Sequence, residues 1–152
     1  MFKKYLSINL PVLFLFVLDR LAKLWFVKNP DFFKEAVAGF LSFQLEKNFG
    51  VAFGLPLNKT LTVILTVIII IILISILLKL YYKKNVWLVF SLSLIILGAG
   101  SNLIDRLKYG FVVDYINVPF FTVFNLADAM ISLGVVLVIS QQLFSQTRHQ
   151  QS

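Results

Sequence analysis

The stretch from Leu61 to Leu78 restricts this chain to a membrane fold more strongly than any other feature. It contains no charged residue, and its only polar residues are threonine and serine. A helix of this length spans the hydrocarbon core of a bilayer, which is about 30 Å thick. The chain is 59% hydrophobic and has a mean hydropathy of +0.90, well above the usual composition of a soluble domain. We therefore expect one membrane domain over residues 1–152.

Three further apolar stretches complete a predicted set of four membrane spans. We place the spans at residues 6–27, 59–79, 86–105 and 120–144, and a polar tail follows at 145–152. The first span begins like a secretory signal, and the sequence Ala-Val-Ala at 36–38 imitates a cleavage site. Because several charged residues separate the apolar run from that site, we expect a retained helix rather than a cleaved signal.

Residues 29–56 show no helical period and predict a small β-structure. The segment from Leu41 to Glu46 alternates strictly between apolar and polar residues, which is typical of a strand with one apolar face. Residues 48–50 are a plausible turn, after which 51–53 can return as a second strand. The expected fold is an all-α membrane protein with four transmembrane helices and a small extracytoplasmic β-hairpin or cradle. We expect the Leu and Phe face of that hairpin to point toward lipid.

Positive charge predicts the orientation of the spans. An even number of spans leaves both termini on the same side of the membrane. Lys79, Lys83 and Lys84 cluster in one short loop, and short loops rich in Lys and Arg remain in the cytoplasm. We therefore expect cytoplasmic termini, with the hairpin and Asp114 on the outer side.

Composition excludes several kinds of site. The chain has no cysteine, which excludes disulfides, thiolate metal sites and a cysteine nucleophile. Its one histidine, His149, lies in the polar tail, so a Ser-His-Asp triad or a histidine-rich metal site is not expected. The net charge of +7 comes from short clusters that flank spans, which indicates membrane topology rather than nucleic-acid binding.

Charged residues near the outer ends of two spans indicate a polar site. Asn102, Asp105 and Arg106 fall within about one helical turn, so all three can point inward. Adjacent opposite charges suggest that Arg106 neutralises Asp105, which is compatible with a site nearby. Asp19 and Lys23 are four residues apart and can pair on one helix face. We interpret that pair as interfacial, with long side chains reaching water, and assign it a structural role.

Asp114 lies in a segment that predicts extended structure. Residues 111–116 are rich in β-branched and aromatic residues, and Pro119 prevents a smooth continuation into the next helix. Extended backbone at membrane depth is tolerated only where protein or a wet cavity covers it. We therefore expect Asp114 at the rim of a cavity.

Asn125 and Asp128 are three residues apart and share a face of the predicted fourth helix. A helix that starts near Phe121 places Asp128 roughly 10 Å into the span. An ionisable group there is costly and predicts a functional site. A partner carboxylate at Asp114 explains why Asp128 is present there. One of two close carboxylates keeps its proton while the other acts as a base. Such a pair of carboxyl groups can activate a water molecule to attack an amide bond.

Five short blocks of this chain together match one protein family. The chain closely resembles the lipoprotein signal peptidases (signal peptidase II), bacterial inner-membrane aspartic proteases with four transmembrane helices. The matching blocks are LDRLAK at 18–23, NFGVAF at 48–53, NLIDR at 102–106, GFVVDY at 110–115 and FNLAD at 124–128. Arg20, Ala22 and Ser101 depart from the family pattern, in which a Gln, a Thr and a Gly are customary at these positions.

The resemblance implies a function and assigns roles to residues. It implies that Asp114 and Asp128 are the catalytic dyad, with no metal or organic cofactor. It further implies a substrate site lined by Asn48, Asn102, Arg106 and Asn125, with Asp19, Lys23 and Asp105 in supporting roles. From spacing alone, Asn48 could equally be a turn residue.

The resemblance also implies the substrate and the location. The substrates are prolipoproteins whose cysteine carries diacylglycerol, and cleavage falls on the N-terminal side of that cysteine. Membrane lipids and inhibitors such as globomycin are further expected partners, the inhibitors at the dyad, and a monomer suffices. The expected location is the bacterial cytoplasmic (inner) membrane, with the active site toward the periplasmic face.

Two functions from other classes are weighed against the peptidase. A small proton- or ion-coupled carrier could relay protons through Asp19, Asp114 and Asp128. The four spans, however, show neither an internal repeat nor a matching pair of broken helices. A purely structural subunit leaves the clustered carboxylates unexplained. Ser101 follows a glycine but has no histidine in the spans to activate it.

Overall fold

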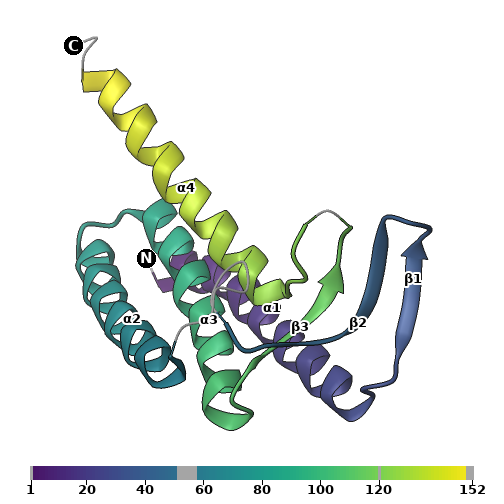
Figure 1. Ribbon diagram of the computed structural model, residues 1–152. Coiled ribbons are helices and arrows are strands. Elements are labelled where there is room, and N and C mark those ends of the chain that lie inside the picture. The colour runs from purple at the N-terminus through teal and green to yellow at the C-terminus, as the bar shows by residue number, and fades with distance from the viewer. Residues whose placement is uncertain (1, 51–57, 120, 150–152) are drawn as a thin grey trace.

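The computed structural model describes residues 2–50, 58–119 and 121–149 (Figure 1). These residues form four helices and a three-stranded sheet. The helices are α1 (Phe2–Lys28), α2 (Lys59–Tyr82), α3 (Val86–Lys108) and α4 (Leu126–His149). The strands are β1 (Phe33–Val37), β2 (Leu41–Asn48) and β3 (Val112–Asn117).

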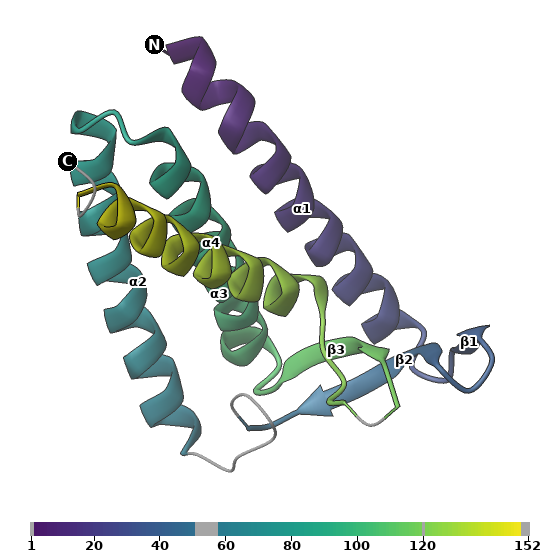
Figure 2. The same ribbon diagram turned by 90° about the horizontal axis from the view of Figure 1, so that it is seen from above.

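Three helices have the length and apolar composition of membrane spans, which confirms the prediction for α2, α3 and residues 126–143 of α4. The span in α2 has a mean hydropathy of 3.4 and only 6% of its residues are buried, as expected of a helix that faces lipid. The α3 helix packs against each of the other three helices and lies in the middle of the bundle (Figure 2). The α1 helix is 27 residues long but also carries buried charged residues.

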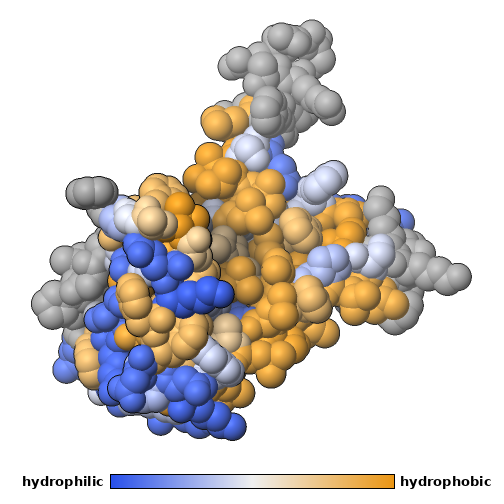
Figure 3. All heavy atoms as spheres, turned by 90° about the vertical axis from the view of Figure 1, so that its right-hand side faces the viewer, coloured by the Kyte–Doolittle hydropathy of each residue, from blue (hydrophilic) through white to orange (hydrophobic). Residues whose placement is uncertain are grey.

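The molecular surface has the apolar character of a protein in lipid. On α1, the side chains of Leu10, Phe14 and Leu21 are each more than half exposed. Figure 3 shows a continuous apolar surface beside a hydrophilic patch. Exposed apolar area of this extent is unfavourable in water and neutral in hydrocarbon. The exposure pattern therefore fits a membrane protein.

The sheet differs from the predicted hairpin in its strand pairing. The strand predicted over 41–46 is present as β2, but its hairpin partner is the preceding strand β1, for which no strand was predicted. On its other edge β2 pairs antiparallel with β3, which confirms the extended segment at 111–116. The predicted return strand at 51–53 lies outside the described residues.

The apolar face of β2 contacts protein, so the prediction that it faces lipid is wrong. Phe43 and Leu45 pack against a cluster formed by Phe26, Val113 and Tyr115. The alternating pattern correctly predicted one apolar face, but it carries no information about what covers that face. Here the end of α1 and strand β3 supply the cover.

The fourth helix begins at Leu126 rather than at residue 120. Residues before it are extended, and the backbone of Phe124 exchanges two hydrogen bonds with Ile116 of β3, at 2.8 and 3.0 Å. This pairing keeps Phe124 extended, so the helix cannot start before it. Asp128 therefore lies in the first turn of α4, not roughly 10 Å inside it. At the other end, α4 continues to His149, so residues 145–149 of the predicted tail are helical.

Close helix contact holds α4 against α3. A Cβ atom at Gly98 would lie 2.6 Å from the carbonyl oxygen of Ala127, and one at Gly134 would lie 2.7 Å from that of Ser91. Only glycine permits this approach of the two backbones. The contact at Gly98 places the C-terminal half of α3 directly beside the first turn of α4.

Candidate active site

Asn125 and Asp128 form a reciprocal cap at the start of α4. The Oδ1 atom of Asn125 accepts a hydrogen bond of 2.9 Å from the backbone N–H of Asp128. In return, Oδ2 of Asp128 accepts one of 3.2 Å from the backbone N–H of Asn125. This is the capping-box arrangement, in which two orphan amides at a helix start are satisfied by side chains. Asn125 precedes α4 instead of sharing a helix face with Asp128, as the sequence had predicted, and the cap fixes the Asp128 carboxylate at the helix start.

Asp114 lies at the centre of β3 with a side chain that is almost inaccessible. The residue is 1% exposed. Its Oδ1 atom accepts a hydrogen bond of 2.6 Å from Nδ2 of Asn125, and its Oδ2 atom accepts one of 3.0 Å from Nδ2 of Asn48. The pairing of β2 with β3 brings Asn48 to this position. Asn48 is therefore a partner of a buried carboxylate in addition to any role in the turn.

Asn125 joins the two carboxylates. Its amide nitrogen donates to Asp114, while its amide oxygen and backbone N–H hold Asp128. Asp128 also accepts a hydrogen bond of 2.8 Å on Oδ1 from Nδ2 of Asn102. The structure thus brings Asp114 and Asp128 to opposite sides of one asparagine, each with its own amide donors.

The surroundings of Asp114 favour its protonated form. Burial, and next the nearby negative charge of Asp128, raise the pKa of Asp114 to about 7, although hydrogen bonds from Asn48 and Asn125 and the charge of Lys23 act in the opposite direction. A carboxyl group with this pKa carries its proton in a large share of molecules at neutral pH. The pair can therefore hold one proton between two carboxylates, as acid–base catalysis by a dyad requires.

A cavity of about 580 Å³ opens beside these groups. Its polar lining includes four residues: Asn48, Asn102, Arg106 and Asp128. The rest of the lining is mostly apolar and comes from α2, α3, β3, α4 and the segment before α4. Asp114 is in contact with the cavity through its bond to Asn48 rather than as an exposed lining residue. Among the described residues, no three His, Cys, Asp or Glu side chains come together as metal ligands.

Lys23 is buried within the site, so its interpretation as an interfacial residue is wrong. Its pairing with Asp19 is confirmed, at 3.3 Å, but both side chains are 0% exposed. The Nζ atom of Lys23 also contacts Oδ2 of Asp105 at 2.8 Å and donates to Oδ1 of Asn102 at 2.6 Å. A charge can remain in the interior only when it is paired and hydrogen-bonded in this way.

Asp19 and Tyr115 both accept hydrogen bonds from the first turn of α4. The Oδ1 atom of Asp19 accepts hydrogen bonds from the backbone N–H of Ala127 at 3.2 Å and from the Tyr115 hydroxyl at 3.1 Å. That hydroxyl accepts a bond of 3.2 Å from the backbone N–H of Leu126. The first three amides of the helix are thus satisfied by side chains of Tyr115, Asp19 and Asn125. Burial and the charge of Asp19 raise the pKa of Tyr115, which keeps its hydroxyl protonated.

Sequence reasoning missed Tyr115 and Arg20 as parts of this site. The sequence signal for Tyr115 was its position next to Asp114 in the extended segment 111–116. Arg20 donates from Nη1 to Oδ1 of Asp105 at 2.6 Å, and to the backbone oxygen and hydroxyl of Ser101 at 3.1 and 3.2 Å. The Ser101 hydroxyl in turn donates to Oδ2 of Asp19 at 2.5 Å. Two departures from the family pattern therefore contact each other.

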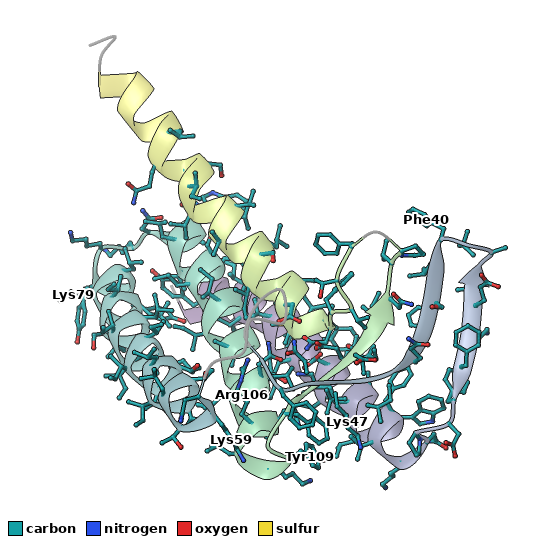
Figure 4. The ribbon with its side chains drawn as sticks, viewed as in Figure 1. Phe40, Lys47, Lys59, Lys79, Arg106 and Tyr109 are labelled. Atoms are coloured by element: carbon teal, nitrogen blue, oxygen red, sulfur yellow. The ribbon has the colours of Figure 1, made fainter. Side chains whose placement is uncertain are left out.

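Arg106 does not neutralise Asp105, which corrects the sequence interpretation. Neighbouring residues on a helix point in different directions, so their side chains do not meet. Asp105 instead pairs with Arg20 and Lys23 across the interface with α1. Arg106, on α3 (Figure 4), lines the cavity and donates from Nη2 to the backbone oxygen of Gly50 at 3.2 Å.

Comparisons with known proteins agree with one another. Residues 11–144 match the family model described as signal peptidase (SPase) II. The chain is 40% identical over 137 residues to a lipoprotein signal peptidase of Streptococcus thermophilus, covering 88% of this chain and 90% of the relative. A lipoprotein signal peptidase of Clostridium tetani is 40% identical over 130 residues, covering 81% and 83% of the two chains. A solved bacterial membrane enzyme superposes with a TM-score of 0.83 at 29% identity, covering 93% of this chain and 90% of that one.

Proposed function

Because this chain belongs to the signal peptidase II family and is a lipoprotein signal peptidase of the aspartic type, we propose that Asp114 and Asp128 are its catalytic dyad. The observation that supports the pairing most directly is the position of Asn125, which donates to Asp114 and caps Asp128. This membership also decides between the peptidase and the proton-coupled carrier weighed from the sequence. Asp19, which the carrier needed as a relay, is bonded to Ser101, Tyr115 and the start of α4.

In the proposed reaction the dyad holds one proton. The ionised carboxylate takes a proton from a water molecule, whose oxygen attacks the scissile carbonyl carbon. The protonated carboxyl donates to the carbonyl oxygen, and proton transfer to the leaving nitrogen then releases the new amine. The pKa of about 7 at Asp114 supports a shared proton near neutral pH. Asn102 and Asn125 hold the carboxylates in place through amide hydrogen bonds.

The cavity beside the dyad is the proposed substrate site. Asn48, Asn102 and Arg106 supply polar groups along one wall, while the apolar lining suits a signal peptide in extended or helical form. Asn125 completes the predicted set of substrate-site residues, although its contacts are to the dyad. Asp19, Lys23 and Asp105 support the site from α1 and α3. Globomycin-type inhibitors are proposed to occupy the same cavity.

The proposed substrate is a prolipoprotein whose cysteine carries diacylglycerol, cut on the N-terminal side of that cysteine. The test uses purified full-length protein and two substrates that differ only in the lipid on the cysteine. Cleavage of the lipidated substrate alone is expected. Equal cleavage of both would contradict lipid recognition while leaving the peptidase assignment intact.

The proposed topology has four spans in a single domain, with α1 as the first span and both termini in the cytoplasm. The lysines at 79, 83 and 84 support this orientation. The site residues then lie toward the periplasmic face of a bacterial inner membrane. We further propose a monomer as the active unit. Reporter fusions after Lys84 and at Asn58 should report cytoplasmic and external locations, respectively, and the reverse labelling would contradict this orientation.

A further inference from the structure

A second cavity lies at the end of the bundle opposite the dyad. It has a volume of about 940 Å³ and is formed between α1, the loop that joins α2 to α3, and the start of α3. Its lining includes Ile8 and Pro11 from α1, Lys83 and Lys84 from the loop, and Trp87 and Phe90 from α3. Figure 2 shows the N-terminal end of α1 and the α2–α3 loop together at the edge of the molecule opposite the sheet. None of these residues contributes to the proposed active site.

The cavity carries uncompensated positive charge. Lys83 and Lys84 are both exposed. The salt bridges among the described residues join only Arg20 and Lys23 to Asp19 and Asp105, far along the bundle. Moreover, the sequence contains no acidic residue in positions 1–18 or 47–104, which include every residue that lines the cavity. The cavity therefore favours an anion.

Apart from Ser7 and Asn85, the remaining walls are apolar and suit a hydrocarbon chain. Ile8, Pro11 and Phe90 lie on the two facing helices. Trp87 lines the cavity, is 68% exposed and lies three residues from Lys84 in the sequence. Tryptophan at such a position marks the boundary between headgroups and hydrocarbon. Positive charge at one end and apolar walls along the rest match the two parts of an anionic phospholipid.

We propose that this groove between α1 and α3 binds one anionic phospholipid, with its phosphate at Lys83 and Lys84 and an acyl chain along Ile8, Pro11 and Phe90. A signal peptide is the wrong occupant, because signal peptides begin with positively charged residues that the two lysines repel. The site is independent of the peptidase reaction, so either assignment can fail without the other.

The test uses Trp87 as a local reporter. The chain has two tryptophans, and Trp25→Phe leaves Trp87 as the only one. The purified variant is placed in mixed micelles with brominated phosphatidylglycerol or brominated phosphatidylcholine, which carry the same acyl chains and differ in headgroup charge. We expect saturable quenching of Trp87 at a lower mole fraction of phosphatidylglycerol than of phosphatidylcholine. Lys83→Gln and Lys84→Gln should each weaken that preference about fivefold.

Lys79→Gln is the matched control, because it removes the same charge from the same end of the bundle. Lys79 is not among the cavity residues and lies on the outer side of α2 (Figure 4). It should retain the lipid preference, and all four proteins should cleave substrate equally. Equal quenching by both lipids would overturn the proposal in favour of bulk lipid. If Trp87 emission instead changed with protein concentration and not with either lipid, the occupant would be a second copy of the chain and the lipid proposal would be overturned.

Discussion

Lys23 donates a hydrogen bond of 2.6 Å from Nζ to Oδ1 of Asn102, although the two residues are 79 positions apart in the chain. Because the amide oxygen faces the lysine, the amide nitrogen faces Asp128, to which it donates at 2.8 Å. An asparagine amide can otherwise turn by half a rotation and present its oxygen to the carboxylate. We therefore propose that Lys23 is a positioning residue that acts on Asp128 through Asn102.

Asn102→Ala should lower kcat about 10- to 100-fold with little change in KM. The variant loses a hydrogen bond to a carboxylate that is proposed to react, and such a bond to a charged group contributes about 1.5–3 kcal/mol. Steady-state kinetics on a lipidated peptide measures the two constants separately. Asn117→Ala is the control, since Asn117 is on β3 but bonds to Ser42 away from the dyad. A rise in KM at constant kcat would instead assign Asn102 to substrate binding.

Asn125→Ser should separate catalysis from helix capping. Serine retains an oxygen that can cap α4 but lacks the Nδ2 donor to Asp114. We expect activity to fall at least tenfold, about the loss of one charge-assisted hydrogen bond, while the melting temperature changes little. Asn58→Ala, which removes the cap of α2, should do the opposite and cost about 1 kcal/mol of stability at full activity. Full activity in Asn125→Ser would show that the bond to Asp114 is dispensable.

Arg20 and Ser101 should be coupled in stability. Ser101→Gly removes the hydroxyl that bonds to Asp19 and accepts from Arg20, so we expect a loss of about 2 kcal/mol, part of it from helix propensity. Ser75→Gly, at an exposed site in the middle of α2, measures the propensity part alone. In a double-mutant cycle with Arg20→Gln, the stability losses of the two single variants should sum to more than the loss in the double variant. Strict additivity would mean that the contact contributes nothing.

The pKa of about 7 at Asp114 predicts how stability depends on pH. This pKa lies above the value of a free carboxyl, so between about pH 4 and pH 7 the folded state binds more protons than the unfolded state. The free energy of unfolding should therefore fall as pH rises through that window. Asp114→Asn should lack this slope and be the more stable protein above pH 7. Glu46→Gln, which removes an exposed carboxylate opposite Asp114 in the sheet, should leave the slope unchanged.

Helices and motifs were predictable from the sequence where local composition decides the structure. The charge-free run in α2 and the alternation in β2 each predict an element without reference to the rest of the chain. The start of α4 was not predictable in this way, because Phe121, Val123 and Phe124 fit a helix as well as a strand. Pairing between Phe124 and Ile116 decides the outcome, and that pairing is a tertiary interaction.

The polar network around Lys23 was beyond sequence reasoning for a similar reason. Spacing correctly paired Lys23 with Asp19 on one helix, yet it could not show that both are buried. Burial depends on how α1 packs against α3, which also brings Arg20 to Asp105. The adjacent pair of Asp105 and Arg106 suggested the wrong partner, because closeness in sequence does not imply contact on a helix.

The dyad is tested most directly by the cleavage rates of Asp114→Asn, Asp128→Asn and the double variant, measured in protein purified free of wild-type enzyme. Each single variant should lose at least about a thousandfold in kcat, and the double variant should be hardly worse, because the two carboxylates act as one unit. Asp31→Asn, at an exposed carboxylate, is the control and should retain full activity. All variants should melt no lower than the parent, since an amide removes the cost of placing a second carboxylate near the buried one of Asp114. Substantial cleavage by either folded single variant would contradict the proposed mechanism.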